Sequence, residues 1–187
     1  MRYLENIDAK RLQVVIVGKD PFPADATNIP FCKPTWEQQL ASNCSGKYVL
    51  RSLGVDLVAA QKTYSTPSGL FEILGLDGIV FLNASYDLIG AKIIKSKHLK
   101  YLLEAHKINK AFIQRARTVV YCGEACKVKW VDAVNSGLCV VHPDIRNRAN
   151  PRTFQRWAAT WGDNALRDKL GIVNHSNSLP STTKLEG

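Results

Sequence analysis

Four short apolar runs, widely spaced along the chain, constrain the fold more than any other feature of the sequence. They extend from Gln13 to Val17, from Gly78 to Leu82, from Thr118 to Cys122 and from Leu138 to Val141. Each is dominated by Val, Ile, Leu or Phe and lacks polar alternation, which is typical of a parallel strand covered on both faces. The runs therefore predict a buried parallel sheet of four strands.

Helical patterns lie between these runs. We expect helices over residues 35–53, 68–74 and 95–116, and a fourth that begins after Gly123 and ends near Val134. Thr35 and Gln38 have the spacing of an N-terminal cap. The alternation of strands and helices predicts an α/β fold, a three-layer α/β/α domain with a central four-stranded parallel sheet.

Length and composition are those of one folded domain. The chain has 187 residues, 45% hydrophobic and 22% charged, and a domain usually has about 100–200 residues. This composition supplies a sizeable core and excludes global disorder. We expect a single domain over residues 1–174 and a polar C-terminal tail over residues 175–187, whose last residues resemble an appended sequence.

The net charge is strongly positive. Lys and Arg number 25 against 16 Asp and Glu, which gives +9 and a sequence pI near 9.4. A charge of this size favours a polyanionic partner, and nucleic acid is the first candidate. A basic protein that is merely soluble has the same composition, so charge alone does not decide.

The cysteines and the chain ends indicate the compartment. Five cysteines form an odd set without a Cys-x-x-Cys pair, which favours reduced thiols in an intracellular compartment. Cys122 and Cys126 lack two further ligands at metal spacing, so we expect no structural zinc or iron–sulfur site. No signal peptide and no apolar run of about 18 residues is present, so secretion and membrane spanning are disfavoured.

Polar residues follow three of the four predicted strands. Asp20 follows the first, Asn83 ends the second, and His142 follows the fourth. Ligands of an open parallel sheet bind beyond the carboxyl ends of its strands. Singly, these residues could be a turn-builder, a helix cap and a loop histidine, but such roles give no reason for all three to share one edge. We therefore expect a site there.

The motifs at this edge resemble those of the family-1 uracil-DNA glycosylases. Residues 18–23, Gly-Lys-Asp-Pro-Phe-Pro, stand where that family has Gly-Gln-Asp-Pro-Tyr-His. The resemblance is closer to the poxvirus-type branch, because Pro23, Asp25, Thr27, residues 29–31 (Ile-Pro-Phe) and Arg146 match it. It covers roughly residues 14–157. It implies a DNA N-glycosylase, a monofunctional hydrolase that flips uracil out of DNA, hydrolyses its N-glycosidic bond and so initiates base excision repair.

The resemblance also implies roles for individual residues. Asp20 and His142 are the implied catalytic residues, of which Asp20 orients water and His142 donates a hydrogen bond to uracil O2. Phe31 stacks on the base, Asn83 pairs with its O4/N3 edge and excludes cytosine, and Phe22 fills the space where the methyl group of thymine would collide. Lys19 contributes through its backbone. No metal and no cofactor are implied.

Further predictions concern the residues that bind DNA, the substrate, the protein partners and the location. By resemblance, Thr35 contacts the DNA backbone and Arg146 enters the duplex as the base leaves. The basic charge of the C-terminal quarter, independently of the resemblance, predicts backbone contacts by Arg148 and Arg152. Single- and double-stranded DNA containing uracil is the implied substrate, replication or repair proteins are possible partners, and no membrane is involved. The nucleoid, the nucleus or a viral replication site is the implied location.

Two departures from the family pattern leave alternatives open. Lys19 replaces Gln, and Asp144 replaces a phosphate-binding Ser. A carboxylate at position 144 repels DNA unless Arg146 or Arg148 neutralises it, so a weakly active or inactive DNA-binding module is the alternative. Lys19 could attack the sugar as an amine, but the adjacent carboxylate opposes this by holding it protonated. A nucleotide-binding protein lacks support, since no Gly-rich phosphate loop follows the first strand.

Overall fold

A computed structural model of the chain describes residues 2–21, 27–90, 95–128 and 137–172. The helices, 3-10 helices and strands occur in the order α1 (Arg2–Glu5), η1 (Ala9–Arg11), β1 (Val14–Gly18), α2 (Trp36–Leu40), α3 (Ser45–Ser52), α4 (Leu57–Thr63), α5 (Pro67–Leu76), β2 (Ile79–Asn83), η2 (Ser96–His98), α6 (Leu99–Arg115), β3 (Thr118–Cys122), η3 (Gly123–Val128), β4 (Leu138–Val140), α7 (Ile145–Ala149), α8 (Pro151–Trp161) and α9 (Ala165–Leu170).

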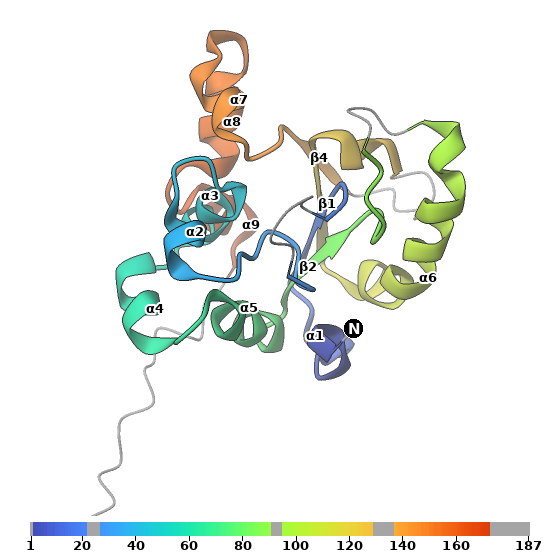
Figure 1. Ribbon diagram of the computed structural model, residues 1–187, viewed down its shortest axis with the longest axis horizontal. Helices are drawn as coiled ribbons and strands as arrows, with labels where there is room; N and C mark the ends of the chain where they lie inside the picture. The colour runs from blue at the N-terminus through green and yellow to red at the C-terminus, as the bar shows by residue number, and fades with distance from the viewer. Residues whose placement is uncertain (1, 22–26, 91–94, 129–136, 173–187) are drawn as a thin grey trace, which may run out of the picture.

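The four strands form one parallel sheet in the order β2-β1-β3-β4 (Figure 1). Val14 on β1 pairs with Ile79 and with Thr118 on the two neighbouring strands. All residues of β1 and β2 are buried, as expected for strands covered on both faces. The prediction of full burial is wrong for β4, where Cys139 is exposed, because in the described part of the chain β4 pairs only with β3.

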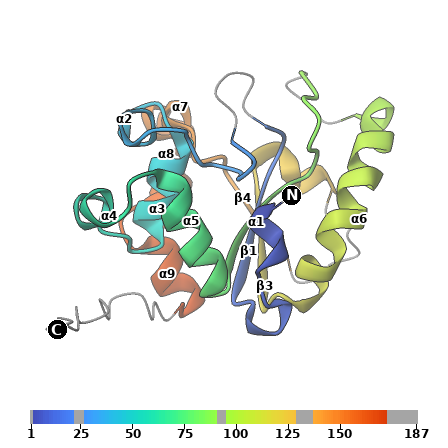
Figure 2. The ribbon, with the colours of Figure 1, turned by 60° about the horizontal axis from the view of Figure 1, so that its bottom comes forward.

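Helices cover both faces of the sheet, which confirms the three-layer prediction. Helix α6 lies on one face, and α3, α5, α8 and α9 lie on the other (Figure 2). The rings of Phe71 on α5 and Phe81 on β2 meet edge to face, with 4.8 Å between their centres. The indole Nε1 of Trp161 on α8 donates to the Val141 carbonyl at 2.7 Å. This bond fixes the chain beside His142.

Several helices differ from the expected ones. The helix expected over residues 35–53 is two helices, α2 and α3, because the Ser42-Asn43 pair between them favours a turn. The helix expected after Gly123 begins as the 3-10 helix η3, and residues 129–136 lie outside the described residues. Helices α1, α4, α7, α8 and α9 were not predicted. Three of them carried a readable signal, since Asp56, Asp144 and Asn150 cap α4, α7 and α8.

Three further observations concern the cysteine thiols, membrane-spanning helices and groups of metal-binding side chains. All five cysteines carry free thiols. Among the described residues no helix combines the length and apolar character that crossing a membrane requires. The same residues contain no group of three His, Cys, Asp or Glu side chains placed to hold a metal ion. The predicted tail, residues 175–187, lies outside the described part of the chain.

Candidate active site

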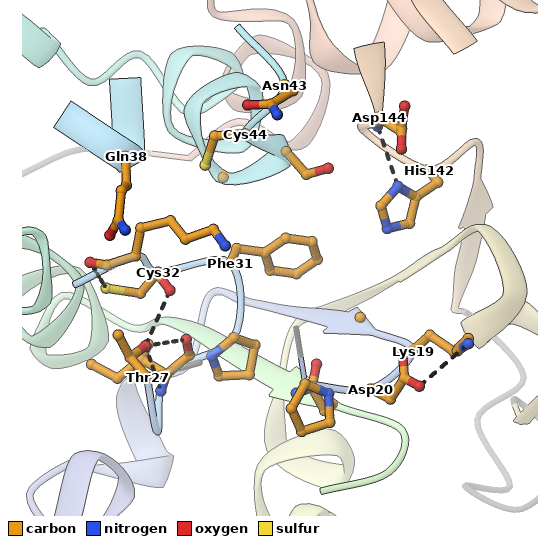
Figure 3. A pocket seen from close by; sticks show the side chains of 18 of the residues that line it. Lys19, Asp20, Thr27, Phe31, Cys32, Gln38, Asn43, Cys44, His142 and Asp144 are labelled. Carbon is orange, nitrogen blue, oxygen red and sulfur yellow. Dashed lines mark hydrogen bonds and ion pairs between the residues drawn. The ribbon is translucent and has the colours of Figure 1, made fainter. Parts of the chain in front are cut away.

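A cavity of about 470 Å³ opens at the carboxyl edge of the sheet. Its walls come from the ends of β1 and β2, the loop over residues 27–33, the connection between α2 and α3, and the loop after β4 (Figure 3). Asp20, Asn83 and His142 all line it. The convergence expected from the strand ends is confirmed.

Asp20 is held in a fixed position at the cavity wall. Its Oδ2 accepts a hydrogen bond from the backbone N–H of Ile89 at 3.0 Å and lies 3.3 Å from Nζ of Lys19. The Asp20 side chain is only 12% exposed. A carboxylate held in this way is preorganised to orient a water molecule or to stabilise a developing positive charge.

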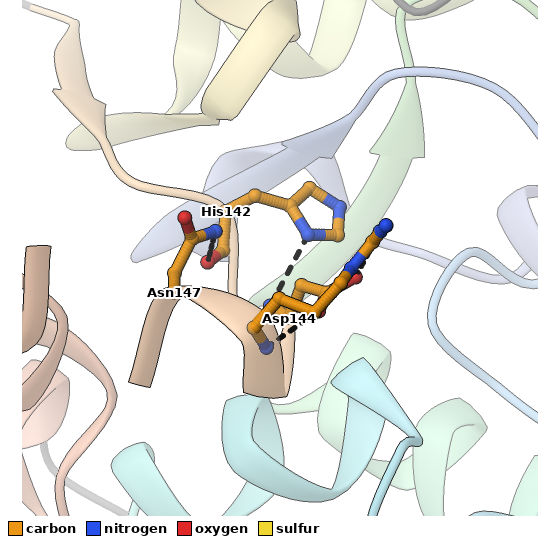
Figure 4. A network of polar contacts seen from close by, with 4 residues as sticks. His142, Asp144 and Asn147 are labelled. Atoms are coloured by element: carbon orange, nitrogen blue, oxygen red, sulfur yellow. Dashed lines mark hydrogen bonds and ion pairs between the residues drawn. The ribbon is translucent and has the colours of Figure 1, made fainter. Parts of the chain in front are cut away.

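His142 is oriented by the backbone of its own loop. Its Nδ1 accepts a hydrogen bond from the backbone N–H of Asp144 at 3.2 Å, and its carbonyl accepts one from Nδ2 of Asn147 at 3.0 Å (Figure 4). Burial lowers the pKa of His142 below its ordinary value, and nearby Arg146 and Lys19 act in the same direction against Asp144 and Asp20. The neutral imidazole therefore carries its proton on Nε2 and is a hydrogen-bond donor there.

Asp144 is the N-cap of α7 and the partner of Arg146. Its Oδ1 accepts from the backbone N–H of Arg146 at 2.8 Å and from Nε at 2.9 Å, and its Oδ2 accepts from the guanidinium at 2.6 Å. These bonds hold the pKa of Asp144 below its usual value. Arg146 thus neutralises the carboxylate that stood out as a departure in the sequence.

Phe31 and Asn83 flank Gly18 at the end of β1. A Cβ on Gly18 would lie 2.9 Å from Oδ1 of Asn83 and 3.2 Å from the ring of Phe31, so only glycine permits this arrangement. Phe31 has a φ of 66°, in the left-handed region that non-glycine residues rarely adopt. Such a conformation persists only where the surrounding structure imposes it, and it is common at ligand sites.

Buried contacts impose that conformation on the loop of Phe31. The fully buried Gln39 donates from Nε2 to the Phe31 carbonyl at 3.3 Å and accepts from the backbone N–H of Lys33 at 2.7 Å. A Cβ on Gly46 would overlap the same Phe31 carbonyl oxygen. Thr27 joins the loop from within, because its hydroxyl lies within hydrogen-bond distance of the Ile29 and Cys32 carbonyls.

Asn83 is supported from behind by a buried polar pair. Nδ2 of Asn109 on α6 donates to the Asn83 carbonyl at 2.8 Å, and Oδ1 of Asn109 accepts from the Tyr86 hydroxyl at 2.7 Å. Sequence reasoning missed both residues. A signal was present, since Asn109 is the one polar residue on a buried helical stripe with Leu102, Ala105 and Ile113.

The other predicted residues are distributed as follows. Lys19, Phe31 and Arg146 line the cavity with the three strand-end residues. Phe22 lies outside the described residues, so its predicted role stays a prediction. The exposed Thr35 is the N-cap of α2, where its hydroxyl accepts from the backbone N–H of Gln38 at 3.3 Å.

Arg148 and Arg152 do not line the cavity. Both are exposed, on α7 and α8, and the guanidinium carbon of Arg148 lies 5.7 Å from the ring centre of Trp157. A second cavity, of about 770 Å³, adjoins the first and shares Lys19, Asp20, His142, Asp144 and Arg146 with it. Glu124 also lines this second cavity. The two cavities together give the site a path along the sheet edge.

Comparison with known proteins finds the fold among solved structures. A point mutant of UNG from Nitratifractor salsuginis matches with a TM-score of 0.52 and 15% identity, over 91% of this chain and 79% of that chain. The wild-type UNG of the same organism matches with a TM-score of 0.50 and 14% identity, over 92% and 78%. A mutant of the mimivirus UNG in complex with UGI is more distant, with a TM-score of 0.47, 10% identity and coverage of 80% and 57%.

Sequence comparison gives no further match: neither a family model nor a curated protein matches this chain. The structural matches show that the chain has the fold of UNG uracil-DNA glycosylases. Identities of 14–15% do not assign an activity. They lend no support to the poxvirus-type branch, which depends on the sequence motifs alone.

Proposed function

We propose that this chain is a uracil-DNA glycosylase that flips uracil out of DNA and hydrolyses its N-glycosidic bond. The observation that carries the proposal is the cavity that gathers Asp20, Phe31, Asn83 and His142 at one sheet edge. The shared fold and the motif resemblance support the same activity. The resemblance of residues 18–31 extends the proposal to a relationship with the poxvirus-type branch.

Phe31 and Asn83, which line the cavity, can recognise the base. Extruding a nucleotide from a duplex costs a few kcal/mol, so the pocket must compensate with contacts to the base. Phe31 presents a ring on which uracil can stack, and Asn83 can both donate to O4 and accept from N3–H. Cytosine carries an amino group in place of O4. The side-chain NH2 of Asn83 and this amino group are both hydrogen-bond donors, so they cannot pair. In this proposal, Phe22 excludes the methyl group of thymine.

Bond cleavage is divided between two groups. As the glycosidic bond breaks, the sugar becomes positive and the departing uracil becomes negative. Asp20 orients the attacking water and stabilises the cationic sugar, the role that carboxylates have in other glycoside hydrolysis. Nε2–H of His142 donates to uracil O2 as negative charge develops there. The neutral imidazole needs no proton transfer for this stabilisation.

DNA is held by basic and polar residues around the cavity. Thr35, Arg148 and Arg152 bind backbone phosphates, Lys19 adds charge beside the pocket, and Arg146 occupies the space that the base leaves. Residues 1–174 form the catalytic domain and residues 175–187 a tail. The protein acts in an intracellular compartment that contains DNA, with replication or repair proteins as partners.

The test of the proposal is release of free uracil from defined oligonucleotides. Single- and double-stranded substrates are incubated with the protein in the presence of a chelator, and free uracil is measured. Asp20→Asn should reduce release by at least about 10²-fold, because it removes the negative charge beside the developing sugar cation. Undiminished release by this variant would exclude the proposed mechanism.

A second function is favoured by the acidic residues of the second cavity. Glu124 and Asp144 both line it beside Asp20, where the sugar and phosphates of an extruded nucleotide would pass. Both carboxylates are paired, Glu124 with Lys127 at 2.9 Å and Asp144 with Arg146 at 2.6 Å. If these pairs fail to offset repulsion of the phosphates, the protein binds DNA without efficient excision. Retention of DNA on a gel together with intact uracil substrates identifies this module.

A further inference from the structure

Helix α6 extends well beyond the carboxyl edge of the sheet. It runs antiparallel to the strands, and the bond from Asn109 to the Asn83 carbonyl places Asn109 level with the end of β2. Ten residues separate Asn109 from Leu99, which at 1.5 Å per residue is about 15 Å of helix. The first turns of α6 therefore stand above the edge at which the cavity opens (Figure 2).

An exposed basic cluster, Lys95, Lys97 and Lys100, lies at this end of the helix, on the 3-10 helix η2 with its N-cap and on the first turn of α6; we call these three residues the α6 lysines. In the described part of the chain, no carboxylate forms an ion pair with any of the three. Lys19 and Arg146, by contrast, each bind a carboxylate at the cavity. Three cations within six residues repel one another, so a bound polyanion would relieve a repulsion that no ion pair among the described residues offsets.

The end of α6 next to the α6 lysines lies across the sheet edge from α7 and α8, which carry Arg148 and Arg152. Figure 2 shows α6 and the α7–α8 pair on opposite sides of the sheet edge. Between these helices, the backbone of Ile89 is bound to Asp20, and Gly90 lines the second cavity. The cavity thus opens between two segments of the chain that carry exposed basic residues.

We propose that the α6 lysines bind the sugar-phosphate backbone of the DNA that flanks the extruded nucleotide. The proposal depends on the proposed function for where the nucleotide enters. DNA fits this surface better than an acidic protein does, because its phosphates recur every few ångströms and can meet both segments at once. These contacts fix the position of the DNA and read no sequence.

The test compares two variants with the same change in charge. In the first, Lys95, Lys97 and Lys100 are all replaced by Gln. In the control, Lys107, Lys110 and Arg115 are replaced by Gln. All three are exposed residues of α6. Lys107 and Lys110 lie near Asn109, level with the sheet edge, and Arg115 lies at the other end of the helix, away from the cavity. The dissociation constant of a uracil-free duplex is measured across a range of salt concentrations. Far-ultraviolet circular dichroism checks that both variants fold.

The α6 variant should flatten the slope of log K against log salt by about two to three units, since each phosphate contact contributes about 0.9. The control should change it by less than about one unit. Equal slopes for the wild type and the α6 variant, equal flattening by both variants, or no duplex binding by the wild type would overturn the proposal. The single variants Lys97→Gln and Lys100→Gln should each flatten the slope by about one unit. They test the proposal if the triple variant does not fold.

Uracil release from a single-stranded substrate separates this inference from the proposed function. If the wild type releases uracil but the α6 lysines leave the salt slope unchanged, only the inference fails. If no uracil is released but the slope depends on the α6 lysines, their contact with the DNA backbone stands and the glycosylase assignment fails.

Discussion

Arg146 is the residue whose position in the free protein differs most from its proposed role. Its guanidinium is bound to both carboxylate oxygens of Asp144, although 87% of its side chain is exposed. To enter a duplex it must release that carboxylate, and an exposed ion pair stabilises by only about 0–1 kcal/mol. The pair is therefore a weak restraint that DNA can displace.

The first prediction follows from this exchange. Arg146→Ala should reduce uracil excision from duplex DNA about tenfold more than excision from single strands, because only the duplex requires the gap to be filled. Rates on both substrates are compared for the wild type and the variant. Equal losses on the two substrates would make Arg146 a simple phosphate contact.

Asn109 supports the second prediction. Replacing it with Leu keeps the branched shape and the number of side-chain heavy atoms but removes the bonds that Asn109 makes with the buried Asn83 carbonyl and the Tyr86 hydroxyl. We expect a loss of about 1–3 kcal/mol of unfolding free energy, together with weaker discrimination between uracil and cytosine. Urea unfolding and release assays on both bases measure this. Tyr86→Phe, which removes one bond only, is the matched control and should lose less.

At the scale of residues, the sequence predicted the side chains at the site better than the hydrogen bonds that orient them. Asp20, Asn83 and His142 could be found because each follows an apolar run, and strand ends of a parallel sheet meet at one edge. The bonds that orient them come from Ile89, Asp144 and Asn109. Two of these are backbone N–H groups, which every residue but proline possesses, so residue type gives no signal for them.

At the scale of elements, α3 determines where Phe31 lies. Its Gly46 packs directly on the Phe31 carbonyl, so the helix and the loop can approach only where no Cβ is present. Gln39, on α2, bonds to the same loop. The division of residues 35–53 into two helices therefore has a consequence, because one continuous helix could not present both contacts to the loop from two directions.

The third prediction compares two helical glycines. Gly46→Ala should destabilise the protein by about 1–3 kcal/mol and reduce uracil excision, because the added methyl displaces the loop of Phe31. Gly69→Ala on α5 should instead stabilise by about 0.5–1 kcal/mol, because its Cβ would meet nothing closer than the Tyr64 ring at 3.6 Å. Thermal unfolding and excision rates test both. Similar effects from the two substitutions would show that α3 does not fix the loop.

The strands were more predictable than the helices. A strand buried on both faces must be apolar throughout, which leaves a strong local signal, and the four observed strands fall within a residue or two of the expected runs. Helices α4, α7 and α9 have only seven, five and six residues. Two turns or fewer show too little periodicity to recognise, and packing against neighbours decides whether they form.

At the scale of the whole molecule, the net charge of +9 is distributed unequally. Exposed basic residues lie on α7 and α8 and, on the other side of the sheet edge, on η2 and the start of α6, while Asp20 and Asp144 at the cavity are paired with Lys19 and Arg146. A molecule arranged in this way attracts a polyanion over a wide face and still presents Asp20 at the point of reaction.

The last prediction concerns the stability of the whole fold as the pH changes. Burial lowers the pKa of His142 below 6.5 in the folded state, so the unfolded chain binds more protons between that lowered value and 6.5. The contribution of His142 to stability is therefore constant above about pH 6.5 and falls as the pH decreases through this window. Asp144 acts in a separate window, because its lowered pKa makes a contribution that is lost only as the pH falls below 3.8.

Urea unfolding of the wild type and of His142→Gln at intervals from pH 8 to pH 5 isolates this effect. The wild type should lose stability relative to the variant below about pH 6.5, while the difference stays constant above it. Asp144→Asn removes a negative charge that favours the imidazolium, so it should lower the pKa of His142 further and leave the plateau in place. The titration of the His142 ring protons by NMR gives the midpoint directly. A midpoint above 6.5 would contradict both the buried environment and the neutral Nε2–H donor on which the proposed catalysis depends.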